Sequence, residues 1–115
     1  MDAILQRLTE LDDVSGAILV GKDGLIVTGT LHSDDEEMIG AMSAAAFGSI
    51  NNYTQQINHG EVRHVMIETP IGTLQLAEVG DLILVVTAQE AGNLGRVRLE
   101  MKKVCRQLLP LVTSS

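Results

Sequence analysis

The segment between Glu37 and Glu61 constrains the fold most, because it has the period of a long helix and contains no Asp, Glu, Lys or Arg. Its apolar stripe follows the 3.6-residue period of a helix that packs on a core. The stripe consists of Ile39, Met42, Ala46, Ile50, Tyr53 and Ile57. The opposite face should meet water and carry charges. That face instead consists of Gly40, Ala41, Ala44, Gly48, Asn51, Asn52 and Gln55.

Within this uncharged face, Gly40, Ala44 and Gly48 form a row at spacing four, which lets another backbone approach closely. Each glycine lowers helix stability by about 1 kcal/mol relative to alanine, so packing should compensate. A chain of 115 residues is too short to surround a helix on all sides, which disfavours burial inside one domain. A closed homodimer is the simplest partner. The residues predicted for its interface are Gly40, Ala41, Ala44, Gly48 and Asn51.

The ends of this helix also have sequence signals. Ser33-Asp34-Asp35-Glu36 has the residue types of a capping box, in which the Ser hydroxyl accepts from the third helical N–H and the Glu reaches back. We therefore expect the helix to begin there and to run to about Asn58, with Gly60 as its terminator.

Five strands are expected around this helix. Before it, two β-rich runs at 17–20 and 25–28 flank Gly21-Lys22-Asp23-Gly24, whose Asp-Gly pair suits a tight hairpin turn. After it, runs at 62–69, 73–79 and 82–87 are separated by short turn-forming links, so neighbouring strands should be antiparallel. The third of these runs is apolar on both faces, which predicts a central position in the sheet.

A helix is expected at each end of the chain. The first has apolar residues at Ile4, Leu5, Leu8 and Leu11 and ends near residues 12–13. The last is capped by Asn93 and ends before Pro110. Its apolar stripe consists of Leu94, Val97, Met101, Val104, Cys105 and Leu108. The predicted order is α-β-β-α-β-β-β-α in a single domain of residues 1–115.

Composition excludes several classes of function. Fifteen acidic and eight basic residues give a net charge of −7, which disfavours nucleic acid as a ligand. The charge-free run at 38–60 is interrupted by Gly, Ser, Asn and Gln, so we expect no membrane span. The start of the chain lacks a basic signal region, and the lone Cys105 cannot form an intrachain disulfide, so we expect a cytoplasmic protein.

The sequence contains no recognisable catalytic, cofactor or metal motif. His32, His59 and His64 lack metal-ligand spacing, and Cys105 falls on an apolar stripe, where packing is its usual role. Gly21-Lys22-Asp23-Gly24 lacks the spacing and the following Ser or Thr of a phosphate loop. The acidic run at 34–37 lacks the spacing of a calcium loop and suits a helix N-terminus. We therefore expect no enzyme, no cofactor and no metal.

The basic residues are concentrated in the last helix. Five of the eight lie there, and Arg98, Lys102 and Arg106 share one row. Two interpretations remain open. The row is either a docking surface for an acidic partner or membrane headgroups, or a solvated helix face whose cations favour the helix C-terminus.

Three segments together resemble the Roadblock/dynein light chain family: GAILVGKDGLIVTGT at 16–30, MIGAMSAAAFGSI at 38–50, and EVRHVMIETPIGTLQLAEVGDLILVVTAQEAGNLGRVRLEMKK at 61–103. The resemblance implies an α/β fold of the α+β type, with a single five-stranded antiparallel sheet sandwiched between one long helix and two terminal helices. It also implies a homodimer in which the sheets join edge to edge and the long helices pair.

Bacterial and archaeal members of this family commonly regulate or scaffold Ras-like small GTPases, so the resemblance implies a non-enzymatic partner of such a GTPase, with stimulation of GTP hydrolysis left open. It places partner contacts near the paired long helices. The residues predicted to make them are Asp34, Asp35, Glu37, Asn52 and Gln55. Two alternatives are a small-molecule sensor of the PAS or profilin-like type, which few aromatic residues disfavour, and a structural subunit of a trafficking or motility complex without a GTPase.

Overall fold

A computed structural model describes residues 1–30, 35–89 and 93–112 and confirms the predicted order of elements. The elements are α1 (Asp2–Thr9), β1 (Val14–Gly21), β2 (Ile26–Gly29), α2 (Glu36–Gln56), β3 (His64–Glu68), β4 (Gly72–Val79), β5 (Leu82–Gln89) and α3 (Leu94–Val112).

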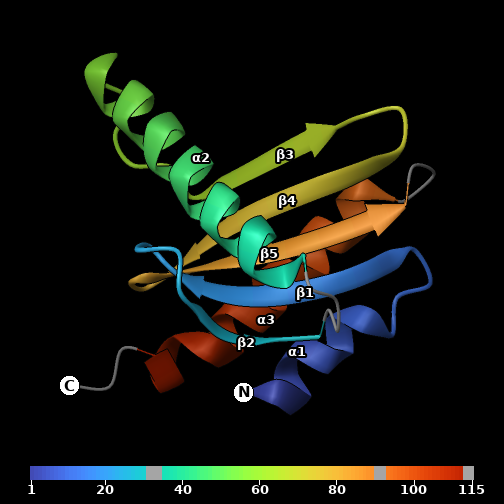
Figure 1. The fold of residues 1–115 in the computed structure, drawn as a ribbon. Helices are drawn as coiled ribbons and strands as arrows, with labels where there is room; N and C mark the ends of the chain where they lie inside the picture. The colour runs from blue at the N-terminus through green and yellow to red at the C-terminus, as the bar shows by residue number, and fades with distance from the viewer. Residues whose placement is uncertain (31–34, 90–92, 113–115) are drawn as a thin grey trace.

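The five strands form one antiparallel sheet in the order β2-β1-β5-β4-β3. The helix α2 crosses one face, whereas α1 and α3 lie on the other face (Figure 1). The doubly apolar run therefore occupies the centre of the sheet, as its composition predicted. The C-terminal part of α2 extends beyond the sheet (Figure 1).

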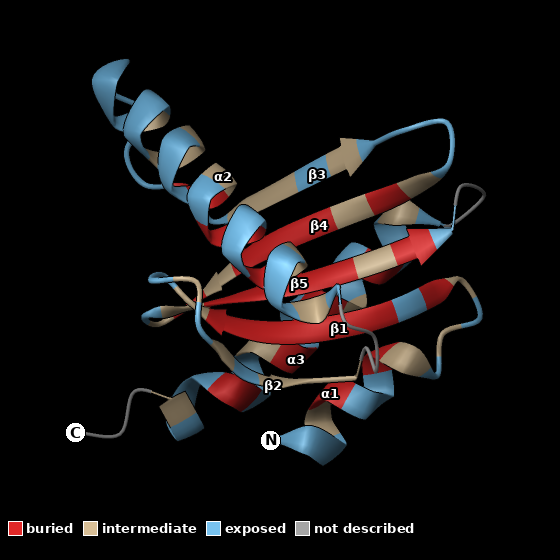
Figure 2. Cartoon of the chain, viewed as in Figure 1, coloured by how far each residue is buried: buried red, intermediate tan, exposed pale blue. Residues whose placement is uncertain are grey.

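Alternation along the strands divides the interior into two cores. Ala17 and Leu19 of β1 pack with α1 and α3, while Ile18 and Val20 pack with α2. The same period of two operates in β5. Because both faces are covered, the three inner strands β1, β5 and β4 are largely buried, whereas the edge strands β2 and β3 contain no fully buried residue (Figure 2).

The hairpin turn between β1 and β2 follows the sequence prediction. Gly24 has φ +91°, a left-handed conformation that its missing side chain permits. The Leu25 N–H donates to Asp23 Oδ1 at 3.0 Å, and the Gly21 N–H donates to the Leu25 carbonyl at 2.8 Å. A Cβ added at Gly24 would lie 3.3 Å from Ala41 Cα, so this turn packs closely against α2.

The predicted capping box of α2 is wrong. The helix begins at Glu36 after Asp35, whose side chain makes no capping hydrogen bond, while Ser33 and Asp34 lie outside the described residues. Glu36 is thus in the first helical position and not the third. Its carboxylate lies beside β2, where a Cβ added at Gly29 would be 2.8 Å from Glu36 Oε2. Glu36 Oε2 is buried there without a hydrogen-bond partner among the described residues.

The other helix ends differ from prediction by a few residues. The helix α2 ends at Gln56, and Asn58, with φ 62°, takes up a left-handed conformation before Gly60 does. The helix α3 starts as predicted, because the Arg96 N–H donates to Asn93 Oδ1 at 3.2 Å. It continues through Pro110 to Val112, whereas the prediction ended it before the proline. Pro110 removes one backbone hydrogen bond, and only two residues of the helix follow it, so little of α3 depends on the lost bond.

Candidate functional site

The helix α2 is rotated from the orientation that its apolar stripe suggested, although Ile39 and Ile50 of the stripe still pack against the core. Its buried residues are Gly40, Ser43, Ala44 and Phe47. Met42 and Tyr53, which belong to the stripe, are 65% and 64% exposed. The prediction that Gly40 and Ala44 lie on the outer face is therefore wrong.

The reason is the close approach of α2 to the β1–β2 hairpin. A Cβ atom added at Gly40 would lie 3.2 Å from Ile26 Cγ1 and 3.4 Å from Val20 Cγ2. A longer side chain at this position would push the helix away from the sheet. The small residues thus face the sheet because they permit the closest packing, although hydropathy favours the face that carries methionine.

The other predicted interface residues have three different environments. Asn51 is half-buried, and its Oδ1 accepts a hydrogen bond from the Val62 N–H at 2.8 Å, which ties the end of α2 to the segment before β3. Ala41 is exposed, although its Cα lies against the hairpin turn. Gly48 is exposed, and a Cβ added to it would meet nothing within 4 Å. Only Ala41 and Gly48 are therefore exposed as predicted.

The exposed residues of α2 after Glu37 form what we call the α2 outer face. They are Met38, Ala41, Met42, Ala45, Gly48, Ser49, Asn52, Tyr53, Gln55 and Gln56. Much of the α2 ribbon is exposed (Figure 2). Although its members differ from those expected, the α2 outer face contains no charged residue, and it exposes two methionines and a tyrosine. A solvated helix face is rarely so apolar.

An apolar groove lies beside the α2 outer face, between α2 and strands β3 and β4. Its volume is about 310 Å³. The side chains that line it include Ile39, Met42 and Ala46 of α2 together with Ile67, Leu74 and Leu76 of the strands. A single helix does not cover this half of the sheet. The sequence did not indicate this groove, because its two walls are separated along the chain.

The strand β3 is the edge of the sheet next to the apolar groove. It pairs with β4 on one side, from His64 opposite Ala77 to Glu68 opposite Thr73. Its other side has no paired strand among the described residues. An edge of this kind presents backbone N–H and C=O groups that a further strand can pair with.

The predicted partner-binding residues divide into two groups along α2. Asp35 and Glu37 are exposed at its start, and Asn52 and Gln55 are exposed near its end. Asp34 lies outside the described residues. Since a helix rises 1.5 Å per residue, about 22 Å separates the two groups within one chain. They do not form one compact site in a single copy.

The described residues offer little for catalysis. Burial raises the pKa of the Cys105 thiol to about 11, so it is protonated at neutral pH. Within residues 1–30, 35–89 and 93–112, no three His, Cys, Asp or Glu side chains come together as metal ligands. No helix in these ranges is both long and apolar enough to cross a membrane.

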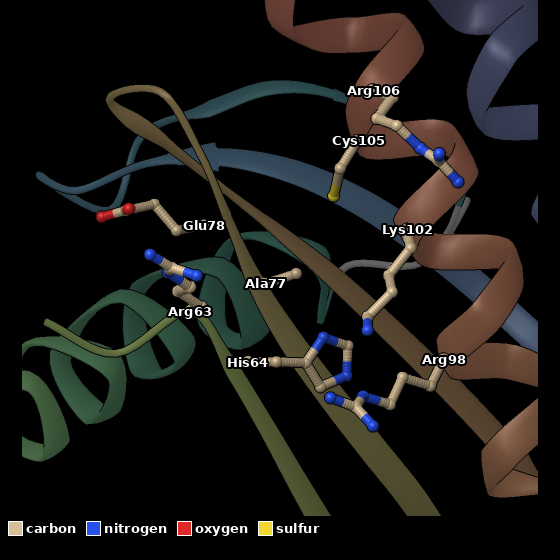
Figure 3. A pocket seen from close by; sticks show the side chains of 8 residues that line it. All are labelled: Arg63, His64, Ala77, Glu78, Arg98, Lys102, Cys105 and Arg106. Carbon is tan, nitrogen blue, oxygen red and sulfur yellow. The ribbon is translucent and has the colours of Figure 1, made fainter.

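A second concave surface lies on the opposite face of the sheet, where α3 borders β3 and β4. Arg98, Lys102 and Arg106 of the predicted basic row line it, together with Arg63 and His64, which the sequence did not connect with them (Figure 3). We call this surface the basic cleft.

The fold, with its single sheet between α2 and the two terminal helices, agrees with a match to a family model. The model of the Roadblock/LC7 domain matches residues 1–88. The chain belongs to the Roadblock/LC7 family.

Individual proteins resemble this Roadblock/LC7 chain over nearly its whole length. The uncharacterized protein MJ1340 of Methanocaldococcus jannaschii is 35% identical over 109 residues, which cover 94% of this chain and 96% of that protein. A Roadblock/LC7 domain from Streptomyces avermitilis has a TM-score of 0.92 at 19% identity and covers 99% and 98% of the two chains. Myxococcus xanthus MglB has a TM-score of 0.90 at 24% identity, with 98% and 94% covered. These two solved structures share the fold.

Proposed function

We propose that this protein is a homodimeric cytoplasmic platform that binds a Ras-like small GTPase and performs no chemistry of its own. The observation that carries the proposal is the α2 outer face, which exposes Met38, Met42 and Tyr53 without a charged residue. Apolar patches of this kind mark interaction surfaces. Complete burial of each large side chain contributes roughly 1.5–3 kcal/mol.

A second copy of the chain is the occupant that the neighbouring features favour. The α2 outer face, the apolar groove and the unpaired edge of β3 adjoin one another on one side of the domain. Pairing about a two-fold axis would cover the apolar residues of that face together with the groove and the edge, because a closed dimer uses the same patch on both copies. The edge of β3 would then extend the sheet into the second copy.

The same pairing would complete the partner-binding surface. If the two α2 helices run antiparallel, Asp35 and Glu37 of one copy lie near Asn52 and Gln55 of the other. Carboxylates and amides together provide acceptors and donors for a basic or polar protein surface. The family resemblance supports a Ras-like GTPase as that partner, and nucleotide chemistry belongs to the partner because this chain has no phosphate loop.

The dimer is tested by Met42→Glu, which places a carboxylate on the α2 outer face. We expect sedimentation equilibrium to give a dimer for the wild type and the monomer mass of 12.3 kDa for the variant, with unchanged circular dichroism. The matched control is Leu99→Glu, an exposed leucine on α3, which should remain dimeric. A wild-type chain that stays monomeric at micromolar concentration, or a Met42→Glu dimer, contradicts the pairing.

GTPase binding is tested with purified Ras-like GTPases of the source organism, loaded with GDP or with a non-hydrolysable GTP analogue. Asp35→Lys with Glu37→Lys should slow association and increase dissociation constants, with the largest effect at low salt. Glu10→Lys with Asp12→Lys changes the charge equally at exposed positions near α1 and should leave binding unchanged. Absence of binding to all of these GTPases, or GTP turnover by this chain alone, contradicts the proposal. Hydrolysis by the GTPase with and without this protein shows whether it also stimulates turnover.

A further inference from the structure

The basic cleft lies on the face of the sheet opposite the α2 outer face, so its ligand would not contact that face. Its volume is about 500 Å³, the size of a small-molecule site. Arg63 and His64 approach it from the start of β3, and Arg98, Lys102 and Arg106 project from α3 (Figure 3).

Positive charge is concentrated in this cleft although the protein as a whole is acidic. Four of the eight Lys and Arg residues of a chain with net charge −7 line it. The four are Arg63, Arg98, Lys102 and Arg106. Their mutual repulsion is unfavourable unless a counter-ion is present.

No described carboxylate forms an ion pair with any of these four cations. The only acidic residue in the lining is Glu78, which forms an ion pair with Lys22 at 3.2 Å between Nζ and Oε2. Glu78 lies at the Arg63 end of the cleft, away from Arg98 (Figure 3). Within the described ranges, the four cationic side chains form no ion pair or hydrogen bond with any protein group.

A buried amide orients His64 toward the cations. Gln75 is 1% exposed, and its Nε2 donates to the Leu94 carbonyl at 3.1 Å. Its Oε1 therefore accepts, so His64 Nε2 is the donor in their 2.6 Å hydrogen bond. His64 Nδ1 has no hydrogen-bond partner among the described residues and is free to donate to a ligand when the ring is protonated.

The electrostatic environment of His64 reflects this arrangement. Burial lowers its pKa most strongly, the hydrogen bond to Gln75 opposes that effect, and the charges of Arg98 and Lys102 lower the pKa further. The other charged groups in the cleft are Arg63 beside His64, Glu78 on β4 and Arg106 on α3. An anion among these cations would favour protonation of His64.

We propose that the basic cleft binds a small anion that carries two or more phosphate charges, such as a diphosphate or a phosphate monoester. Guanidinium groups of Arg63, Arg98 and Arg106 can donate to phosphate oxygens in pairs. A single carboxylate would neutralise only one of the four cations. The remaining lining residues, Ala77 and Cys105, offer no aromatic surface on which a nucleobase could stack, so the phosphate charges are the recognised feature.

Isothermal titration calorimetry of the full chain with inorganic pyrophosphate tests this site. We expect saturable binding of one pyrophosphate per chain, weakened at least about tenfold by Arg98→Glu with Lys102→Glu because charge-assisted contacts are lost. The matched control is Arg96→Glu with Lys103→Glu, which changes the net charge equally on α3 but outside the cleft. The control should bind within about twofold of wild type.

Three outcomes overturn the proposal. They are absence of saturable binding, equal weakening by both double variants, and tight binding of an acidic peptide with none of pyrophosphate. Circular dichroism checks folding, and Arg98→Gln with Lys102→Gln provides a milder variant if the charge reversal unfolds the chain. Because Arg98 and Lys102 lie away from the α2 outer face, this pair of substitutions should leave GTPase binding nearly intact. Loss of pyrophosphate binding can thus be distinguished from loss of GTPase binding, which tests the proposed function.

Two further measurements define the ligand. In NMR pH titrations, added sulfate should raise the pKa of His64. The His64→Gln variant identifies which resonance belongs to His64. An unchanged pKa would contradict contact between the bound anion and His64. Flotation with vesicles that contain phosphatidic acid, which has a phosphate monoester headgroup, separates the two sources of phosphate. Flotation that pyrophosphate inhibits indicates a lipid headgroup, whereas calorimetric binding without flotation indicates a soluble phosphate.

Discussion

The two longest helices, α2 and α3, lie on opposite faces of one sheet and differ in the size of their buried side chains and in the charge of their exposed ones. In α3 the buried residues Val97, Met101, Val104 and Leu108 are large, and charged residues occupy much of the exposed surface. In α2 the buried row has small residues at Gly40, Ser43 and Ala44, and after Glu37 no charged residue follows.

This difference shows how side-chain size sets the distance between a helix and a sheet. Large inward residues of α3 fill a broad core with α1, and its cations remain in water. The small residues of α2 bring its backbone close to the hairpin, which leaves Met42 and Tyr53 exposed. Both helices expose large apolar side chains, Leu99, Leu109 and Leu111 in α3 and Met38, Met42 and Tyr53 in α2. Only in α2 do they lie on a face without charged residues, which a partner can cover.

The strongest test of this comparison substitutes two adjacent alanines of α2. Ala44 is 7% exposed and Ala45 is exposed, so Ala44→Glu should lower the free energy of unfolding by about 3 kcal/mol or more, because a carboxylate is buried without a partner. Ala45→Glu should leave the chain folded. Urea denaturation measures both. Equal midpoints for the two variants would mean that α2 is rotated about its axis from the orientation described.

A smaller effect should separate the two glycines of α2. Gly40→Leu should destabilise the fold by roughly 1–3 kcal/mol, because the side chain would displace Ile26 and Val20. Gly48→Ala should stabilise the monomer by up to about 1 kcal/mol, since nothing lies within 4 Å and alanine favours helix. Thermal unfolding in the Met42→Glu background separates these effects from dimerisation. Destabilisation by Gly48→Ala in that background would contradict an open position.

The smallest effect concerns the other face of the sheet, where His64 contributes to the pH dependence of stability. Its pKa in the folded chain lies below the ordinary value of 6.5, so near that pH the unfolded state binds more protons. The contribution of His64 to the free energy of unfolding is therefore complete above pH 6.5. This contribution is lost as the pH falls from 6.5 through the pKa of His64 in the folded chain. Between pH 8 and pH 5, the wild type should lose more stability than His64→Gln. Parallel urea-denaturation profiles would show that His64 has no such role.

Much of the fold follows from sequence because its signals are local. The Asp23-Gly24 pair specifies the hairpin turn, Asn93 specifies the start of α3, and the doubly apolar run becomes the central strand β5. Each of these features depends on neighbouring residues and on the periods of helix and strand. The resemblance to the Roadblock/dynein light chain family implied the layers, and the structure confirms them.

Other features were decided only by tertiary structure. The two faces of α2 are both uncharged, and hydropathy favoured the face that carries Met42, which the structure leaves exposed. The orientation depends instead on how closely Gly40 approaches the β1–β2 hairpin. The carboxylate of Glu36 lies beside β2 instead of capping its own helix. His64 and Arg98 belong to separate elements, and the basic cleft exists only because α3 packs beside the strands β3 and β4. Periodicity determines which residues share a face, whereas packing against distant residues determines what that face meets.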